Sequence, residues 1–194
     1  MPVFSFLLFV VITSFTPGPN NIMAMALANK HGLKKSMLFC LGVGIGFFVI
    51  TLLCSLFNIA LTKVMPIIER PLTIVGVGYM LYLAYKILTS KDSDSENTVS
   101  TNNLLLIGML LQFVNPKGIL FAITVVATFI LPYHSSYLSY FLFSLFLGMV
   151  GMMSTYSWGL FGSAFQKLLL QYRRQFNIVM AVLLMYSAFS ILMT

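Results

Sequence analysis

Six apolar runs, each about as long as a lipid bilayer is thick when helical, constrain this chain more than any other sequence feature. Charged residues make up only 8% of the chain, against about a quarter of a soluble domain. The chain has too few charged residues to cover a water-facing surface, so we expect the lipid bilayer to surround most of the exterior. The sequence predicts an all-α membrane protein, one transmembrane transporter domain over residues 1–194. The six predicted transmembrane helices lie near residues 3–27, 36–61, 65–88, 104–131, 137–162 and 176–193.

Basic residues in the loops predict the orientation of these helices. With six spans, both termini share a side with the second and fourth loops, where the only basic residues are Lys63 and Arg70. Positive loops stay in the cytoplasm, so we expect both termini outside. The net charge of +7 is spread over separate loops, which argues against a nucleic-acid partner. The basic residues of the opposite side are Lys30, Lys34, Lys35, Lys86, Lys91, Lys167, Arg173 and Arg174.

A polar segment at residues 90–103 divides the chain into two halves of three spans, about 1–89 and 104–194. A three-span repeat enters the membrane from opposite sides in its two copies, so an internal repeat here must be inverted. The first span of each half contains a polar break with proline, at Thr16–Asn21 and at Gln112–Gly118. We therefore predict two inverted three-helix repeats in which helices 1 and 4 of the chain are broken.

The residues of the two breaks are typical of unwound helix. Proline lacks an amide hydrogen and moves the preceding residue out of helical geometry. Pro17 and Pro116 each lie roughly 20 Å along their spans at helical rise, so we expect the two breaks to approach one another near the middle of the bilayer. Unwound backbone is tolerated there only against protein or a wet cavity, and the exposed helix N-termini attract anions such as a carboxylate. The alternative is that both breaks are packing kinks.

Lys117 is the one strongly charged residue that lies deep within a predicted span. An ionisable group at that depth indicates function, and Lys117 could bind a substrate carboxylate or release its proton. The only Asp or Glu within the bounds of a predicted span is Glu69, at the outer end of the third, so proton coupling would use Lys117, Glu69 or the substrate itself. The predicted helix-breaking residues are Pro17, Pro19 and Pro116. The predicted substrate-binding residues are Thr16, Gly18, Asn20, Asn21, Gln112, Asn115 and Lys117.

Other classes of protein remain open at this point. A membrane-embedded enzyme would need a nucleophile–base pair or metal ligands at depth, and the spans contain no His, Asp or Glu away from their ends. We therefore expect no catalytic residue, no metal and no cofactor. A non-transporting membrane subunit, or an exporter of a different small metabolite, is the alternative. Glycines such as Gly42, Gly46 and Gly148 bring helices close together, either within one chain or between two chains of a homo-oligomer.

Three segments carry a family resemblance: FTPGPNNIMAMALANKHGLKKSM, LQFVNPKGILFAITVVATFILP and RRQFNIVMAVLLMYSAFSIL. They resemble the LysE/RhtB family of amino-acid exporters, most closely the cysteine/O-acetylserine exporters. The family's motifs fall on Thr16–Asn20 and on Asn115–Lys117. The resemblance implies a protein of the bacterial inner membrane, so the outer side predicted for both termini is the periplasm. It also implies proton-driven secondary active export of small amino acids or their derivatives from the cytoplasm to the outside.

Overall fold

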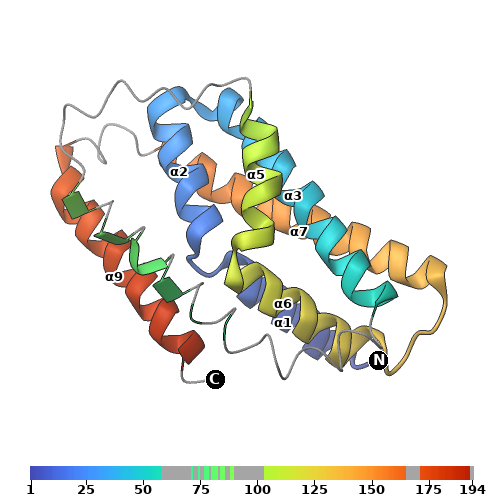
Figure 1. Ribbon diagram of the computed structural model, residues 1–194. Coiled ribbons are helices and arrows are strands. Elements are labelled where there is room, and N and C mark those ends of the chain that lie inside the picture. Colours follow the sequence, from blue (N-terminus) through green and yellow to red (C-terminus); the bar gives the residue numbers. More distant parts are fainter. Residues whose placement is uncertain are drawn as a thin grey trace.

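The structure is a computed structural model, and it describes residues 1–57, 103–164 and 171–192 together with scattered positions from 71 to 89. Within these ranges all regular structure is helical (Figure 1). The expected third span, 65–88, is covered only at single positions, and Glu69 with linker residues 90–102 lies outside the described residues. The elements are α1 (Val3–Phe15), α2 (Pro19–His31), α3 (Leu33–Leu56), α5 (Leu104–Val114), α6 (Pro116–Val125), the π-helix η2 (Val126–Ile130), α7 (Tyr137–Ala164) and α9 (Arg173–Leu192).

The helices show that this is a multi-pass membrane protein. α3, with 24 residues, and α7, with 28, are each long and apolar enough to cross a bilayer. Two further pairs reach that length only together: α1 with α2, bent by 49°, and α5 with the helix Pro116–Ile130, bent by 66°. The described residues therefore contain two membrane-crossing helices, or four if each bent pair is one span. The apolar stretch of α9 is shorter, Asn177–Tyr186.

Both bends fall at prolines, but the unwound stretches are shorter than the sequence indicated. Thr16 is extended (ψ 149°), Gly18 is the extended N-cap of α2, and Asn115 is the extended N-cap of α6. Pro19 and Pro116 then take the first helical position, where the missing amide is not needed. Only Thr16–Gly18 and Asn115 are unwound. The other residues of the two breaks lie in helical turns: Asn20 and Asn21 in α2, Gln112 in α5, and Lys117 and Gly118 in α6.

The two broken helices run in opposite directions. In Figure 1, α2 lies beside α5 at one end of the molecule, and α1 lies beside α6 at the other. α3 packs against both α5 and α7. Glycines allow this close approach: a Cβ on Gly44 would come within 3.0 Å of the Gly148 carbonyl oxygen, and one on Gly46 within 2.7 Å of the Met109 carbonyl oxygen. These glycines therefore pack helices within one chain.

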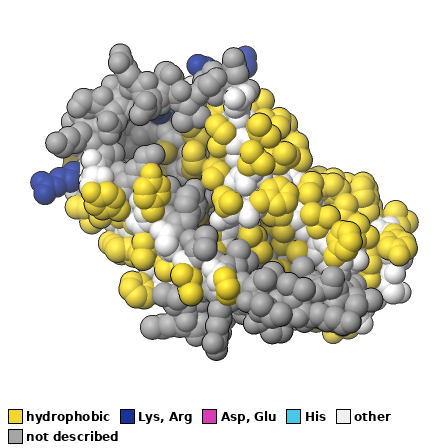
Figure 2. Space-filling view, in the orientation of Figure 1, with side chains coloured by type: hydrophobic (Ala, Val, Ile, Leu, Met, Phe, Trp, Pro, Cys, Tyr) yellow, Lys and Arg dark blue, Asp and Glu magenta, His cyan; other side chains and the backbone are white. Residues whose placement is uncertain are grey.

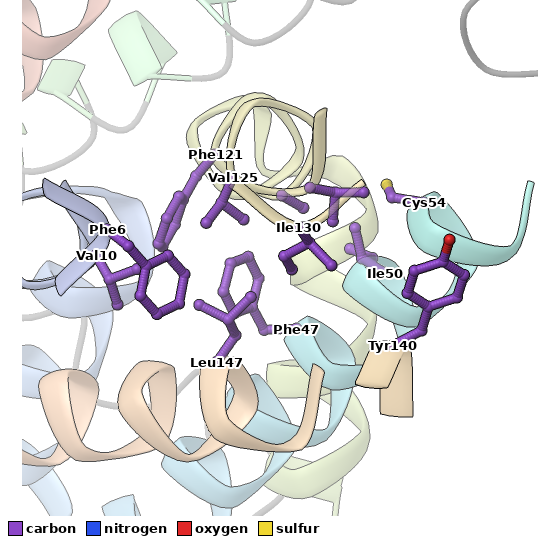
Figure 3. Close-up of a cluster of buried hydrophobic side chains, with 12 residues drawn as sticks. Phe6, Val10, Phe47, Ile50, Cys54, Phe121, Val125, Ile130, Tyr140 and Leu147 are labelled. Carbon is purple, nitrogen blue, oxygen red and sulfur yellow. The ribbon is translucent and has the colours of Figure 1, made fainter. Parts of the chain in front are cut away.

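An aromatic and aliphatic cluster fills the end of the molecule around α1 and α6 (Figure 3). Phe6 and Val10 of α1 meet Leu147 of α7 there, and the rings of Phe47 and Phe121 lie 5.0 Å apart between centroids. The outer surface is also mainly apolar. On the visible face, Lys and Arg side chains lie near the junction of α2 with α3 and near the start of α9 (Figure 2). Apolar flanks with basic ends suit a bilayer-embedded protein.

Candidate functional site

A cavity lies where the two helix breaks meet. The empty space between its lining residues is about 420 Å³, which includes space open to the surroundings. Every predicted binding residue except Thr16 lines it. The lining residues are Thr13, Ser14, Gly18, Asn20, Asn21, Val43, Phe47, Gln112, Asn115, Lys117, Gly118, Phe121, Gly151, Ser154 and Thr155.

Lys117 joins the two breaks across the cavity. From the first turn of α6 its ammonium donates to the carbonyl oxygen of Thr16 (2.8 Å), to the Thr16 hydroxyl oxygen (2.8 Å) and to the carbonyl oxygen of Pro17 (3.3 Å). Thr16 is 101 residues away along the chain. These bonds bring a positive charge to the C-terminal end of α1, where the helix dipole is negative. Lys117 is the only charged residue among the described residues that line the cavity.

Three side-chain amides form a second connection between the breaks. Asn20 of α2 and Asn115 both donate their amide NH₂ groups to the Oε1 atom of Gln112 in α5, the latter over 3.2 Å. The Oδ1 atom of Asn115 accepts from the backbone amide of Gly118 and so caps α6. Asn20 is 7% exposed and Gln112 4%. Within the described structure, the Asn20 Oδ1 and the Gln112 Nε2 make no hydrogen bond, which leaves one acceptor and one donor group available.

The carbonyl groups at the end of α1 are satisfied by side chains from other helices. Asn21 of α2 donates to the carbonyls of Ser14 (2.9 Å) and Thr16 (3.0 Å). From α7, Ser154 donates to the Ser14 carbonyl (2.6 Å), and Trp158 to the Phe15 carbonyl (3.2 Å). These donors supply what water would supply outside a membrane. Neither Ser154 nor Trp158 is among the binding residues predicted from the sequence, so these two donors were missed.

The helix ends around the cavity carry charge of both signs. The C-terminal end of α1 is negative and the N-terminal end of α2 is positive, because carbonyls and amides respectively lack helical partners there. The N-cap residue of α2 is Gly18, which has no side chain to cap the helix, whereas the Asn115 side chain caps α6. The amides of Asn20 and Asn21 follow Gly18 and Pro19, and Gly18 lies beside the Lys117 side chain. This arrangement suits a small ligand with one negative and one positive group.

The remaining lining residues are partly apolar and partly hydroxyl-bearing. Val43, Phe47 and Phe121 are apolar, and Phe47 and Phe121 also belong to the cluster of Figure 3. Ser154 and Thr155 of α7 add hydroxyl groups to the lining. This polar pair interrupts a long apolar helix, a sequence signal that could have marked it as cavity lining. Among the residues that the structure describes, no group of three or more His, Cys, Asp or Glu is placed to hold a metal ion.

Comparison with known proteins gives a consistent family match. The model of the LysE type translocator family matches residues 11–194. A cysteine/O-acetylserine efflux protein of Salmonella typhimurium is 39% identical over 184 residues, covering 95% of this chain and 94% of the relative. A protein of the same name in Escherichia coli is 38% identical over 186 residues, with the same coverage. No solved structure matches the chain.

Proposed function

This chain belongs to the LysE type translocator family, and from that membership we propose that it exports small amino acids of the cysteine/O-acetylserine type across the bacterial inner membrane. Its family consists of translocators rather than enzymes. The relatives at 38–39% identity are efflux proteins for cysteine and O-acetylserine. One structural observation carries the proposal: two helix breaks from distant parts of the chain enclose one cavity with a single cation and helix ends of both signs.

The substrate is a zwitterion, and each of its charges has a partner in the cavity. The amides at Gly18, Asn20 and Asn21, together with Lys117, receive the carboxylate. Acceptor oxygens receive the ammonium. Of the side-chain oxygens, the Gln112 Oε1 already accepts from two amides, whereas the Asn20 Oδ1 and the second lone pair of the Asn115 Oδ1 can accept from the ammonium. Gln112 then contributes by positioning Asn20 and Asn115, and its Nε2 adds a further donor.

Transport follows from the opposite directions of the two broken helices. The proposed arrangement is six spans in two inverted repeats, with both termini on the periplasmic side. It agrees with Figure 1, in which α1 begins and α9 ends on the same side of the molecule. A substrate enters from the cytoplasm and binds between the breaks. One half then rocks against the other and opens the cavity outward. The Phe47–Phe121 pair lies between the cavity and the end of the molecule where α1 begins. These two rings therefore move apart when the cavity opens outward.

The proton gradient drives this cycle, with the proton carried by Lys117, Glu69 or the substrate. The test is accumulation of labelled O-acetylserine or cysteine in inside-out vesicles, with and without an imposed pH gradient. Gradient-dependent accumulation supports proton-driven export. Equal accumulation in vesicles with and without the protein, when the protein is present and folded, contradicts the assigned substrate class.

A further inference from the structure

Three glycines line the cavity, and at two of them another side chain of the protein takes the space that a Cβ would fill. A Cβ on Gly18 would lie 2.9 Å from the Cδ atom of Lys117, and one on Gly118 would lie 3.1 Å from the Oε1 atom of Gln112. Both distances are too short for an ordinary van der Waals contact. These two glycines therefore make room for polar side chains of the site itself.

The third glycine, Gly151 of α7, has no such close neighbour within the described structure. The three atoms nearest to a Cβ at this position would all belong to Phe47, at 3.4 to 3.8 Å, which are ordinary contact distances. Both residues line the cavity. The missing side chain at Gly151 therefore leaves room for a ligand beside the ring of Phe47.

Gly151 belongs to the face of α7 that turns toward the cavity. Ser154 and Thr155 follow it by three and four residues, so they share its helix face, and both also line the cavity. Leu147, four residues before Gly151, belongs to the apolar cluster of Figure 3. Gly151 is thus the position where the hydroxyl-bearing part of this face meets its apolar part.

The space beside Gly151 lies close to the cation of the site. Phe121 follows Lys117 by four residues in α6, a rise of about 6 Å along the helix. Its ring centroid is 5.0 Å from that of Phe47, and Phe47 in turn borders Gly151. A small amino acid whose carboxylate binds at Lys117 can therefore reach this space with its side chain.

We infer that the space between Gly151 and the ring of Phe47 receives the side chain of the exported amino acid and limits its length. This inference rests on the proposed function and adds a specificity-determining position to it. The hydroxyl groups of Ser154 and Thr155 already donate to backbone carbonyls, and the residues around the space carry no charge. A short uncharged side chain, such as the thiol of cysteine or the acetyl ester of O-acetylserine, suits this lining.

Gly151→Ala tests the inference on the purified full-length protein. The dissociation constants of labelled O-acetylserine and of labelled cysteine are measured for the intact chain and for the variant. The added methyl group shortens the space, so the longer acetyl ester should lose about 10-fold in affinity relative to the thiol, the effect of one methylene group in a closely fitting pocket. Alanine also favours a helix more than glycine does, so we expect this variant to fold.

Gly159→Ala is the matched control. Gly159 lies on the same helix but does not line the cavity, and the atom nearest to its added Cβ would also be 3.4 Å away, the Oγ atom of Ser36. The ratio of the two dissociation constants should stay that of the intact chain.

A second variant enlarges the space from the opposite side. Phe47→Leu removes the ring, so it should improve the binding of O-propionylserine relative to O-acetylserine by about 10-fold. This variant decides the question if Gly151→Ala does not fold, and a ratio equal to that of the intact chain then refutes the pocket.

The outcomes separate this inference from the proposed function. If the intact chain binds O-acetylserine and the ratio of the two dissociation constants is the same in Gly151→Ala and Gly159→Ala, the side-chain pocket is refuted and the exporter proposal stands. A larger loss for cysteine than for O-acetylserine in Gly151→Ala also refutes the pocket. If the intact chain, shown to be folded, binds neither ligand, the proposed substrate class fails and the pocket fails with it.

Discussion

The two helix breaks differ in where the partners of their freed backbone groups come from. At the first break, Thr16–Gly18, the carbonyls at the end of α1 are bonded by side chains from three other helices: Asn21 of α2, Lys117 of α6, and Ser154 with Trp158 of α7. At the second break the partners are local. Asn115 caps Gly118 and donates to Gln112, each three residues away.

This difference shows two ways to keep a broken helix inside a membrane. The second break is encoded by its own short sequence, and its N-cap is already occupied. The first break is completed by the tertiary structure, and its helix N-terminus at α2 stays uncapped. The first break is therefore the one whose backbone groups can exchange hydrogen-bond partners, and we propose that the substrate binds there. The second break is the more rigid support that carries Lys117.

The largest effect is expected for Lys117→Met, which removes the cation that links the two breaks. Export of O-acetylserine should fall by about 10- to 100-fold, the effect of losing hydrogen bonds to a charged group. Uptake into inside-out vesicles measures it. The control is Lys34→Met, an exposed lysine of α3, which should transport normally. Undiminished transport by Lys117→Met would show that Lys117 does not take part in substrate binding.

Asn21→Ala should show how far the first break depends on α2. The variant loses hydrogen bonds to the Ser14 and Thr16 carbonyls, so we expect the free energy of unfolding to fall by about 2 kcal/mol, at about 1 kcal/mol for each bond. Denaturation by SDS titration in mixed micelles measures this. An unchanged midpoint of the SDS titration would mean that the remaining donors to the α1 carbonyls are enough to stabilise the first break.

Asn115→Ala should have a smaller effect, because the second break loses mainly one N-cap. Loss of such a cap typically lowers the free energy of unfolding by about 1 kcal/mol, measured in the same titration. Asn115→Ser keeps a capping oxygen and should recover most of the loss. If Asn115→Ala is more destabilising than Asn21→Ala, the contrast between the two breaks is wrong.

Trp158→Phe should have the smallest effect of the four. It removes one donor to the Phe15 carbonyl, over a distance of 3.2 Å at a partly exposed position, so we expect a decrease of about 0.5–1 kcal/mol in the free energy of unfolding. Thermal unfolding in detergent, compared with the intact chain, measures it. A decrease equal to that of Asn21→Ala would show that Trp158 stabilises the first break more than its single hydrogen bond indicates.

The sequence predicts the breaks well because proline acts locally. Pro19 and Pro116 set the starts of α2 and α6, and Lys117 was recognisable because it lies deep in an apolar run. The donors on α7 were not recognisable. A membrane helix is apolar on every side, so its hydropathy pattern does not tell which face turns inward, and Ser154 and Trp158 contact α1 only through tertiary packing. The extent of each unwound stretch was overestimated for a related reason, since polar residues such as Asn20 and Gln112 pair with each other while remaining helical.

The central claim is that both breaks form one amino-acid site, and a double-mutant cycle on substrate binding tests it most directly. The affinity for labelled O-acetylserine is measured for the intact chain, Asn20→Ala, Gln112→Ala and the double variant. Because Asn20 donates to Gln112 across the breaks, the account predicts that the two losses are not additive, with a coupling of about 0.5–3 kcal/mol. Additive losses, or variants that bind as tightly as the intact chain, would contradict a single shared site.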